Sequence, residues 1–254
     1  MCTELTLLNF DESQQAVLSP ASEGDFQLPA KGLLWLTDDH HFQQFVAVHH
    51  GQAVAHFDSI TKVAQIYQLT IEDQTMVVAQ APLGSAAAVM ILESLIAFGV
   101  RQVLAVGSCG ALVSEQENRL LLPQAALRDE GCSFHYLPAS NWVTLEPSAI
   151  KAIQTELERR EYSVKLVKTW TTDAIFRETK AKISAVKAVG CQVVEMECAA
   201  LAACAQFRQI EFAQLLYTAD SLANLNRHDP RHWGEDAVMP TIDLAAQVLA
   251  SWSY

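Results

Sequence analysis

The sequence predicts an α/β fold: a single domain, residues 1–254, in which helices flank a central mixed β-sheet. Short apolar runs alternate along the chain with segments of helical pattern, which is typical of a sheet covered by helices. The run Gln102–Val106 is apolar after its first residue, as in a strand buried on both faces. Half of the residues are hydrophobic, which is enough for one large core.

The first half of the chain is predicted to alternate strands with two helices. Gly99 follows a long apolar segment, and glycine commonly ends a helix. Glu72-Asp73 lies between two apolar runs and predicts a turn. We therefore expect strands at Leu33–Leu36, Lys62–Thr70, Thr75–Gln80 and Gln102–Val106, and helices at His40–His49 and Ser85–Phe98.

The second half is predicted to continue this alternation. An amphipathic pattern predicts a helix over Glu146–Glu161, and Gly190 closes a basic helical segment. The polar segment Ser221–Pro240 is expected to form a mobile flap over a site. The other elements expected are strands at Val164–Thr169, Cys191–Val194 and Phe212–Tyr217, and helices at Arg177–Val189, Met196–Phe207 and Asp243–Trp252.

Charge and hydropathy exclude several classes of partner. The formal net charge is −12, and no basic stripe stands out, which argues against nucleic acid. The apolar runs are too short to cross a bilayer, and the first residues lack the basic start and apolar stretch of a signal peptide. We therefore expect a cytoplasmic protein with no membrane partner.

Cysteine and histidine patterns do not indicate a metal site. The six cysteines have no paired metal-type spacing, and His40-His41 and His49-His50 lack the helical spacing of metal ligands. Several cysteines lie among apolar or small residues and are expected to be reduced thiols in the core. The clearest are Cys109, Cys198 and Cys204.

Two small-residue segments could bring backbone N–H groups close to an anion. Gly84-Ser85 precedes a helix, whose first N–H groups and dipole favour negative charge. The alternative is that Ser85 caps that helix. Gly107-Ser108-Cys109-Gly110 follows the buried strand, and ligands gather beyond the carboxyl ends of strands in open α/β sheets. The alternative there is an ordinary tight turn.

Acidic residues mark two further strand ends. Glu195 and Glu197 flank Met196 at a strand-to-helix junction, where the helix dipole alone would favour them. The helix that follows looks buried, however, and a buried carboxylate needs donors such as sugar hydroxyls. Asp220 ends another strand and is either a site acid or a turn aspartate. Arg177 is the best-placed cation, with surface pairing to the next glutamate as its alternative.

Together these segments resemble the nucleoside phosphorylase family, which includes uridine phosphorylases, hexameric purine nucleoside phosphorylases and related nucleosidases. The resemblance runs from about Leu33 to the C-terminus and leaves residues 1–32 as an N-terminal extension. Val194–Leu201, with its Glu-Met-Glu core, is the most specific motif. Thr171–Thr179 is similar to a segment of a divergent bacterial branch of that family.

The resemblance implies a sugar-binding part of the site. Glu197, in the same motif as Glu195, would hold ribose hydroxyls, with Met196 against the sugar. Ser108 and the backbones of Gly84 and Gly107 would line the side of the phosphate or other nucleophile.

It also implies a base-binding part. Phe176 and Arg177 would lie near the base, and Asp220 stands where purine-acting members keep an aspartate that donates a proton to the leaving base. No cofactor is implied beyond inorganic phosphate as co-substrate. The expected assembly is a homodimer or a hexamer built from dimers.

The sequence departs from the family at two places that concern phosphate. The early Gly-Asp-Pro loop with its following Arg is replaced by Leu36–His41, and Ala105 stands where an Arg is common. The favoured function is cleavage of the N-glycosidic bond of a purine or pyrimidine nucleoside by phosphate, giving base and ribose 1-phosphate. The alternatives are a nucleosidase that uses water and a non-catalytic nucleoside- or base-binding protein.

Overall fold

The computed structural model describes residues 5–253, and within them the strands form one mixed sheet. The hydrogen-bonded order is β10-β6-β8-β9-β5-β1-β4-β3-β2, and β7 pairs with β6. Because β10 also pairs with β5, the strands β10, β6, β8, β9 and β5 close into a ring, and the rest of the sheet continues from β5. The bounds are β1 Lys31–Trp35, β2 Gln52–Asp58, β3 Val63–Ile71, β4 Gln74–Gln80, β5 Gln102–Ala111, β6 Leu120–Asp129, β7 Trp142–Thr144, β8 Lys165–Thr172, β9 Val193–Glu195 and β10 Glu211–Ser221.

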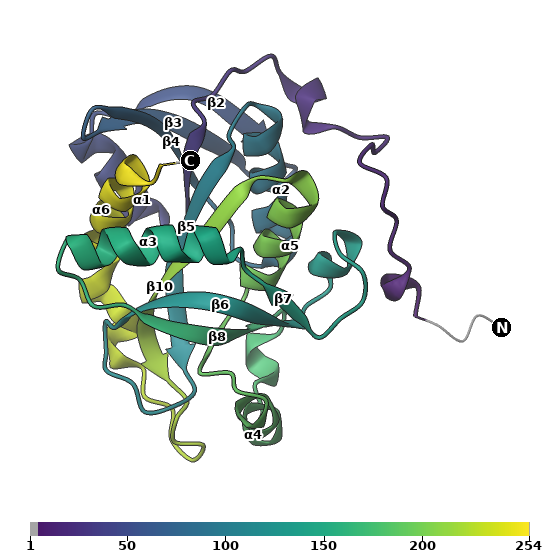
Figure 1. The fold of residues 1–254 in the computed structure, drawn as a ribbon, viewed down its shortest axis with the longest axis vertical. Helices are drawn as coiled ribbons and strands as arrows, with labels where there is room; N and C mark the ends of the chain where they lie inside the picture. The colour runs from purple at the N-terminus through teal and green to yellow at the C-terminus, as the bar shows by residue number, and fades with distance from the viewer. Residues whose placement is uncertain (1–4, 254) are drawn as a thin grey trace.

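Helices lie on both sides of β5 (Figure 1). On one side α2 and α5 pack against each other, and on the other α6 packs against α1, α3 and β1. Strands β1, β4, β5 and β10 are parallel, so their carboxyl ends share one edge of the sheet. The bounds are α1 Asp39–Val48, α2 Ser85–Ala97, α3 Pro147–Arg159, α4 Lys180–Ala188, α5 Cys198–Arg208 and α6 Glu235–Ser251.

The predicted fold class is confirmed, and each predicted helix and strand has a counterpart. The predicted turn at Glu72-Asp73 is also confirmed, since both residues have positive φ between the antiparallel β3 and β4. The predicted core thiols Cys109, Cys198 and Cys204 are buried and unbridged. Among the described residues, no helix is long and apolar enough to cross a membrane.

Several boundaries differ from the prediction. The strand at Gln102–Val106 continues to Ala111, because β10 and then β9 pair with its second half, so the tight-turn interpretation of Gly107–Gly110 is wrong. The basic helix expected from Arg177 begins at Lys180, where Thr179 supplies the N-cap. The expected flap over Ser221–Pro240 shrinks, because α6 already begins at Glu235.

Candidate functional site

A cavity of about 290 Å³ opens at the shared carboxyl edge of the parallel strands. It is small for a ligand site, since such pockets usually measure about 300–1,000 Å³. Six of the predicted site residues line it: Gly107, Ser108, Glu195, Met196, Glu197 and Asp220. The other lining residues are Leu36, Thr37, Ala81, Leu83, Cys109, Gly110, Ile175, Glu178, Val194, Gln214, Ala219, Leu222 and Trp233.

Glu195, the last residue of β9, is held from two directions. Its Oε2 accepts hydrogen bonds from the N–H groups of Glu197 (2.8 Å) and Cys198 (2.6 Å), at the start of α5. Its Oε1 accepts from the hydroxyls of Thr171 (2.6 Å) and Thr169 (3.2 Å) on β8. Burial raises the pKa of Glu195, and these four donors act against that rise. Its oxygens are thus occupied by the protein, and the residue fixes the strand-to-helix junction.

Glu197 lies in the same junction but keeps free acceptor capacity. Its Oε1 accepts a 2.7 Å hydrogen bond from the N–H of Gly84, and its Oε2 accepts a 3.3 Å bond from the N–H of Met196. The residue is only 4 % exposed. Burial, and then the negative charge of Glu195, raise the pKa of Glu197 to about 8. A carboxylate has about four lone-pair sites, so two donors leave room for ligand hydroxyls.

The start of α2 is tied to this junction. Gly84 is the N-cap residue with φ +98°, a conformation that favours glycine, and its N–H points at Glu197 rather than at free space for an anion. Ser85 does not cap the helix, so the capping interpretation is wrong. Instead its hydroxyl donates a 2.6 Å hydrogen bond to the carbonyl of Met196. The helix therefore orients both Met196 and Glu197.

A neutral amide that the sequence analysis missed lines the cavity. Gln214 on β10 is 1 % exposed, and its Oε1 has no hydrogen-bond partner among the described residues. It pairs in register with Ala105, one of the positions where the family commonly has an Arg. A single polar residue inside the apolar run Phe212–Tyr217 was the available signal.

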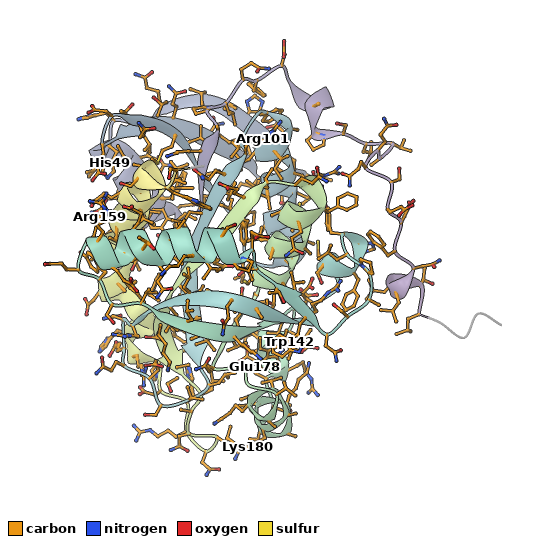
Figure 2. The ribbon with its side chains drawn as sticks, in the orientation of Figure 1. His49, Arg101, Trp142, Arg159, Glu178 and Lys180 are labelled. Carbon is orange, nitrogen blue, oxygen red and sulfur yellow. The ribbon has the colours of Figure 1, made fainter. Side chains whose placement is uncertain are left out.

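Two carboxyl groups and a histidine gather at the end of β10. Asp220 Oδ1 lies beside Gly110, and its Oδ2 is hydrogen-bonded to Nε2 of His228 at 2.7 Å. Glu178 also lines the cavity, from the segment between β8 and α4 (Figure 2). Burial, and then the negative charge of Asp220, raise the pKa of Glu178 to about 7. Sequence reasoning assigned no site role to Glu178 or His228.

The two residues expected near the base lie outside the cavity lining in this chain. Phe176 is 96 % exposed and Arg177 is exposed as well, both in a short 3-10 helix, Ile175–Arg177. Their neighbours Ile175 and Glu178 line the cavity instead. This segment therefore contributes an apolar side chain and an acid to the cavity, but no cation.

The charge of the lining has one sign. Among the lining residues that the structure describes, four are acidic, and none is Lys or Arg: Glu178, Glu195, Glu197 and Asp220. Across residues 5–253, no group of three or more His, Cys, Asp and Glu side chains is placed to hold a metal ion. The cavity thus suits a neutral or cationic ligand that donates hydrogen bonds.

Comparison with known proteins matches residues 36–251 to the family described as Phosphorylase superfamily. Among solved structures, the chain is similar to a purine nucleoside phosphorylase from Toxoplasma gondii in complex with immucillin-H (15 % identity, TM-score 0.73, covering 89 % of this chain and 91 % of that one). It is also similar to a uridine phosphorylase from Vibrio fischeri (18 %, TM-score 0.73, 88 % and 91 %). A third is the 5'-methylthioadenosine/S-adenosyl homocysteine nucleosidase of Helicobacter pylori (16 %, TM-score 0.68, 89 % and 98 %). At these identities the likeness shows the fold alone.

One curated relative is an uncharacterized protein of Acanthamoeba polyphaga mimivirus, 25 % identical over 140 residues. The match covers 55 % of this chain and 54 % of the relative, so the chain spans about half the length of the curated relative that it matches. These relatives come from a virus, a protist and bacteria, and they give no support to a specifically bacterial branch.

Proposed function

The chain belongs to the phosphorylase superfamily, and from this premise we propose that it is an enzyme that cleaves the N-glycosidic bond of a nucleoside. The observation that carries the proposal is the buried carboxyl of Glu197, oriented by the N–H of Gly84 and lining an acidic cavity. Cleavage builds positive charge on the sugar and negative charge on the leaving base. A site that binds the sugar diol beside carboxylates and supplies a proton to the base stabilises both changes.

In this proposal Glu197 binds the ribose hydroxyls and Met196 lies against the sugar. The free acceptor sites of Glu197 match two neighbouring hydroxyl donors. Both carboxyl oxygens of Glu195 already accept hydrogen bonds from the protein, so Glu195 does not bind the sugar. It acts as a positioning residue for Glu197. At the other end of the cavity, Asp220 and Glu178 form an acidic wall beside the leaving base. The family resemblance implies a proton donor at this position.

We favour water over phosphate as the nucleophile, so the proposed activity is that of a nucleosidase. Phosphate is usually held by Arg forks or by the free N–H groups of a helix N-terminus. Here the cavity lining described above has no Lys or Arg, Gln214 borders Ala105, and the Gly84 N–H is already bonded to Glu197. Phosphorolysis, the function that the sequence favoured, would place a dianion among four carboxyl groups.

We also propose that the site is completed in an oligomer, a homodimer or a hexamer of dimers. Leu83, Ile175 and Trp233 line the cavity and are yet strongly exposed in a single chain, and Phe176 protrudes beside them. Exposed apolar side chains gathered around one cavity are typical of surfaces that associate. Light scattering coupled to size-exclusion chromatography should give a mass of at least two chains, and a monomer would contradict this proposal.

A nucleoside panel with and without phosphate tests the activity. We expect base and free ribose in both tubes, because water is the nucleophile in this proposal. Glu197→Gln should lower the rate strongly, whereas Glu158→Gln, an exposed change on α3, is the matched control. Base release only with phosphate, together with ribose 1-phosphate, would establish phosphorolysis instead. Ligand binding without turnover would make the chain a nucleoside-binding protein.

A further inference from the structure

The four carboxyl groups of the cavity differ in how fully the protein satisfies them. Glu195 accepts four hydrogen bonds, Glu197 accepts two, and Asp220 is bonded to His228. The side chain of Glu178 has no hydrogen-bond partner among the described residues, although it is partly buried. Of the lining acids described here, it is the one whose oxygens are wholly available to a ligand.

The charged groups around Glu178 come from three elements. Asp220, at the end of β10, repels a negative charge on Glu178, whereas His228, in the segment after β10, and Lys182, on α4, stabilise it. Burial and the repulsion by Asp220 outweigh these two opposing contributions, which is why the pKa of Glu178 rises to about 7. Lys182 is also drawn away, because its Nζ lies 2.5 Å from Asp129.

We infer that Glu178 is the acid that gives a proton to the departing base, and that Asp220, anchored by His228, keeps that proton on Glu178. This inference rests on the proposed cleavage of a nucleoside. It assigns to a residue outside the Glu-Met-Glu motif the role that the resemblance gave to Asp220. Enzymes often place two carboxyl groups in one site, where the negative charge of one keeps the other protonated. This arrangement assigns the acid role to one group and the base role to the other.

The proton inventory of the step is balanced. The C1′–N bond breaks, its electron pair goes to the base, and a base nitrogen takes the proton from the Glu178 carboxyl. The water oxygen bonds to C1′ and loses one proton to solvent. Glu178, now a carboxylate beside Asp220, regains a proton from solvent before the next turnover.

The test compares two leaving groups in Glu178→Gln. A purine nucleoside needs protonation of its base, whereas the phenolate of 4-nitrophenyl β-D-riboside leaves without it. We expect kcat/KM for the nucleoside to fall by at least about 100-fold. For the nitrophenyl riboside we expect the value to change by less than about threefold, since the sugar contacts are intact. Glu158→Gln is again the control, and Glu178→Asp should restore part of the nucleoside activity.

Equal losses on both substrates, or no loss on either, would overturn the role of Glu178 as proton donor. If the unaltered protein cleaves neither substrate, the proposed function itself fails, which is a different result.

A second variant leaves Glu178 in place. In the unaltered protein, kcat/KM for the nucleoside should fall as the pH rises through about 7. His228→Asn removes a side chain that lowers the pKa of Glu178, so this fall should move to higher pH. His228 is exposed, with 44 % of its side-chain surface accessible, so the variant should fold normally. A fall that stays in place, or that moves to lower pH, would contradict the inference.

Discussion

Glu197→Gln is expected to make the stability of the folded chain less sensitive to alkaline pH. Burial, and then the charge of Glu195, raise the pKa of Glu197 from 4.5 to about 8. Between these two values the folded chain holds a proton that the unfolded chain has lost. The stabilising contribution is therefore fully present below pH 4.5 and is lost as the pH rises through about 8. A glutamine has nearly the same shape and no proton to lose.

The magnitude follows from the size of the pKa change. One pKa unit corresponds to about 1.4 kcal/mol, so a rise from 4.5 to about 8 corresponds to an upper value of about 5 kcal/mol. Relaxation of the cavity and entry of water lower this value. We therefore expect the free energy of unfolding of Glu197→Gln, relative to the unaltered protein, to increase by about 2–4 kcal/mol between pH 5 and pH 9.

Urea unfolding at pH 5, 7 and 9 measures this difference, with Glu158→Gln as the exposed control. At pH 5 the variant should be equally or slightly less stable. In the unaltered protein the N–H groups of Gly84 and Met196 donate to the carboxyl oxygens of Glu197, and in the variant the amide NH₂ faces one of them and cannot accept its hydrogen bond. A difference that is constant with pH, or that shrinks as the pH rises, would refute the reasoning. It would mean that Glu197 is charged in the folded chain with little penalty.

Three further predictions concern the same cavity. Binding of a ribose-containing ligand at pH 7 should release protons from Glu197, because hydroxyl donors favour its charged form. Calorimetry in buffers of different ionisation enthalpy detects this release, and identical heats of binding in all buffers would count against it. Gly110→Ala puts a Cβ 2.9 Å from Leu222 Cδ1, 3.0 Å from Asp220 Oδ1 and 3.1 Å from Val194 Cγ1. It should lower kcat/KM by about 10- to 100-fold and lower the thermal midpoint as well, and unchanged kinetics would show that Asp220 can move freely. Thr171→Val removes a donor to Glu195 and should cost about 1–3 kcal/mol in urea unfolding, whereas an unchanged midpoint would show that the remaining donors suffice.

The parts of the site that could be predicted are those encoded locally. Glu195 and Glu197 lie at a strand-to-helix junction, and an apolar strand followed by small buried residues is visible in the sequence itself. Asp220 likewise ends an apolar run. In each case a few neighbouring residues determine the backbone, so the chain sequence is sufficient to place the side chain at a strand end.

The parts that were missed depend on contacts between distant segments. Glu178 faces the cavity because the Ile175–Arg177 turn delays the start of α4, and its relation to Asp220 requires the end of β8 and the end of β10 to meet. Strand β6 was not among the predicted strands; Pro123 lies inside it, and proline argues against a central strand. The structure accommodates that proline with a register shift against β8 between Pro123 and Ala125.

The residues around the cavity come from two kinds of segment: the closed ring of strands and the connections outside it. Strand β9, only three residues long, is hydrogen-bonded on one side to β5 and on the other to β8, so the Glu-Met-Glu segment stands on a frame without a free edge. Glu178, His228 and Trp233 instead come from connecting segments outside that frame. Sequence changes in these connections would alter which leaving group is accepted, while the sugar-binding part stays intact. The fold can therefore acquire new substrate preferences without a change in the strands.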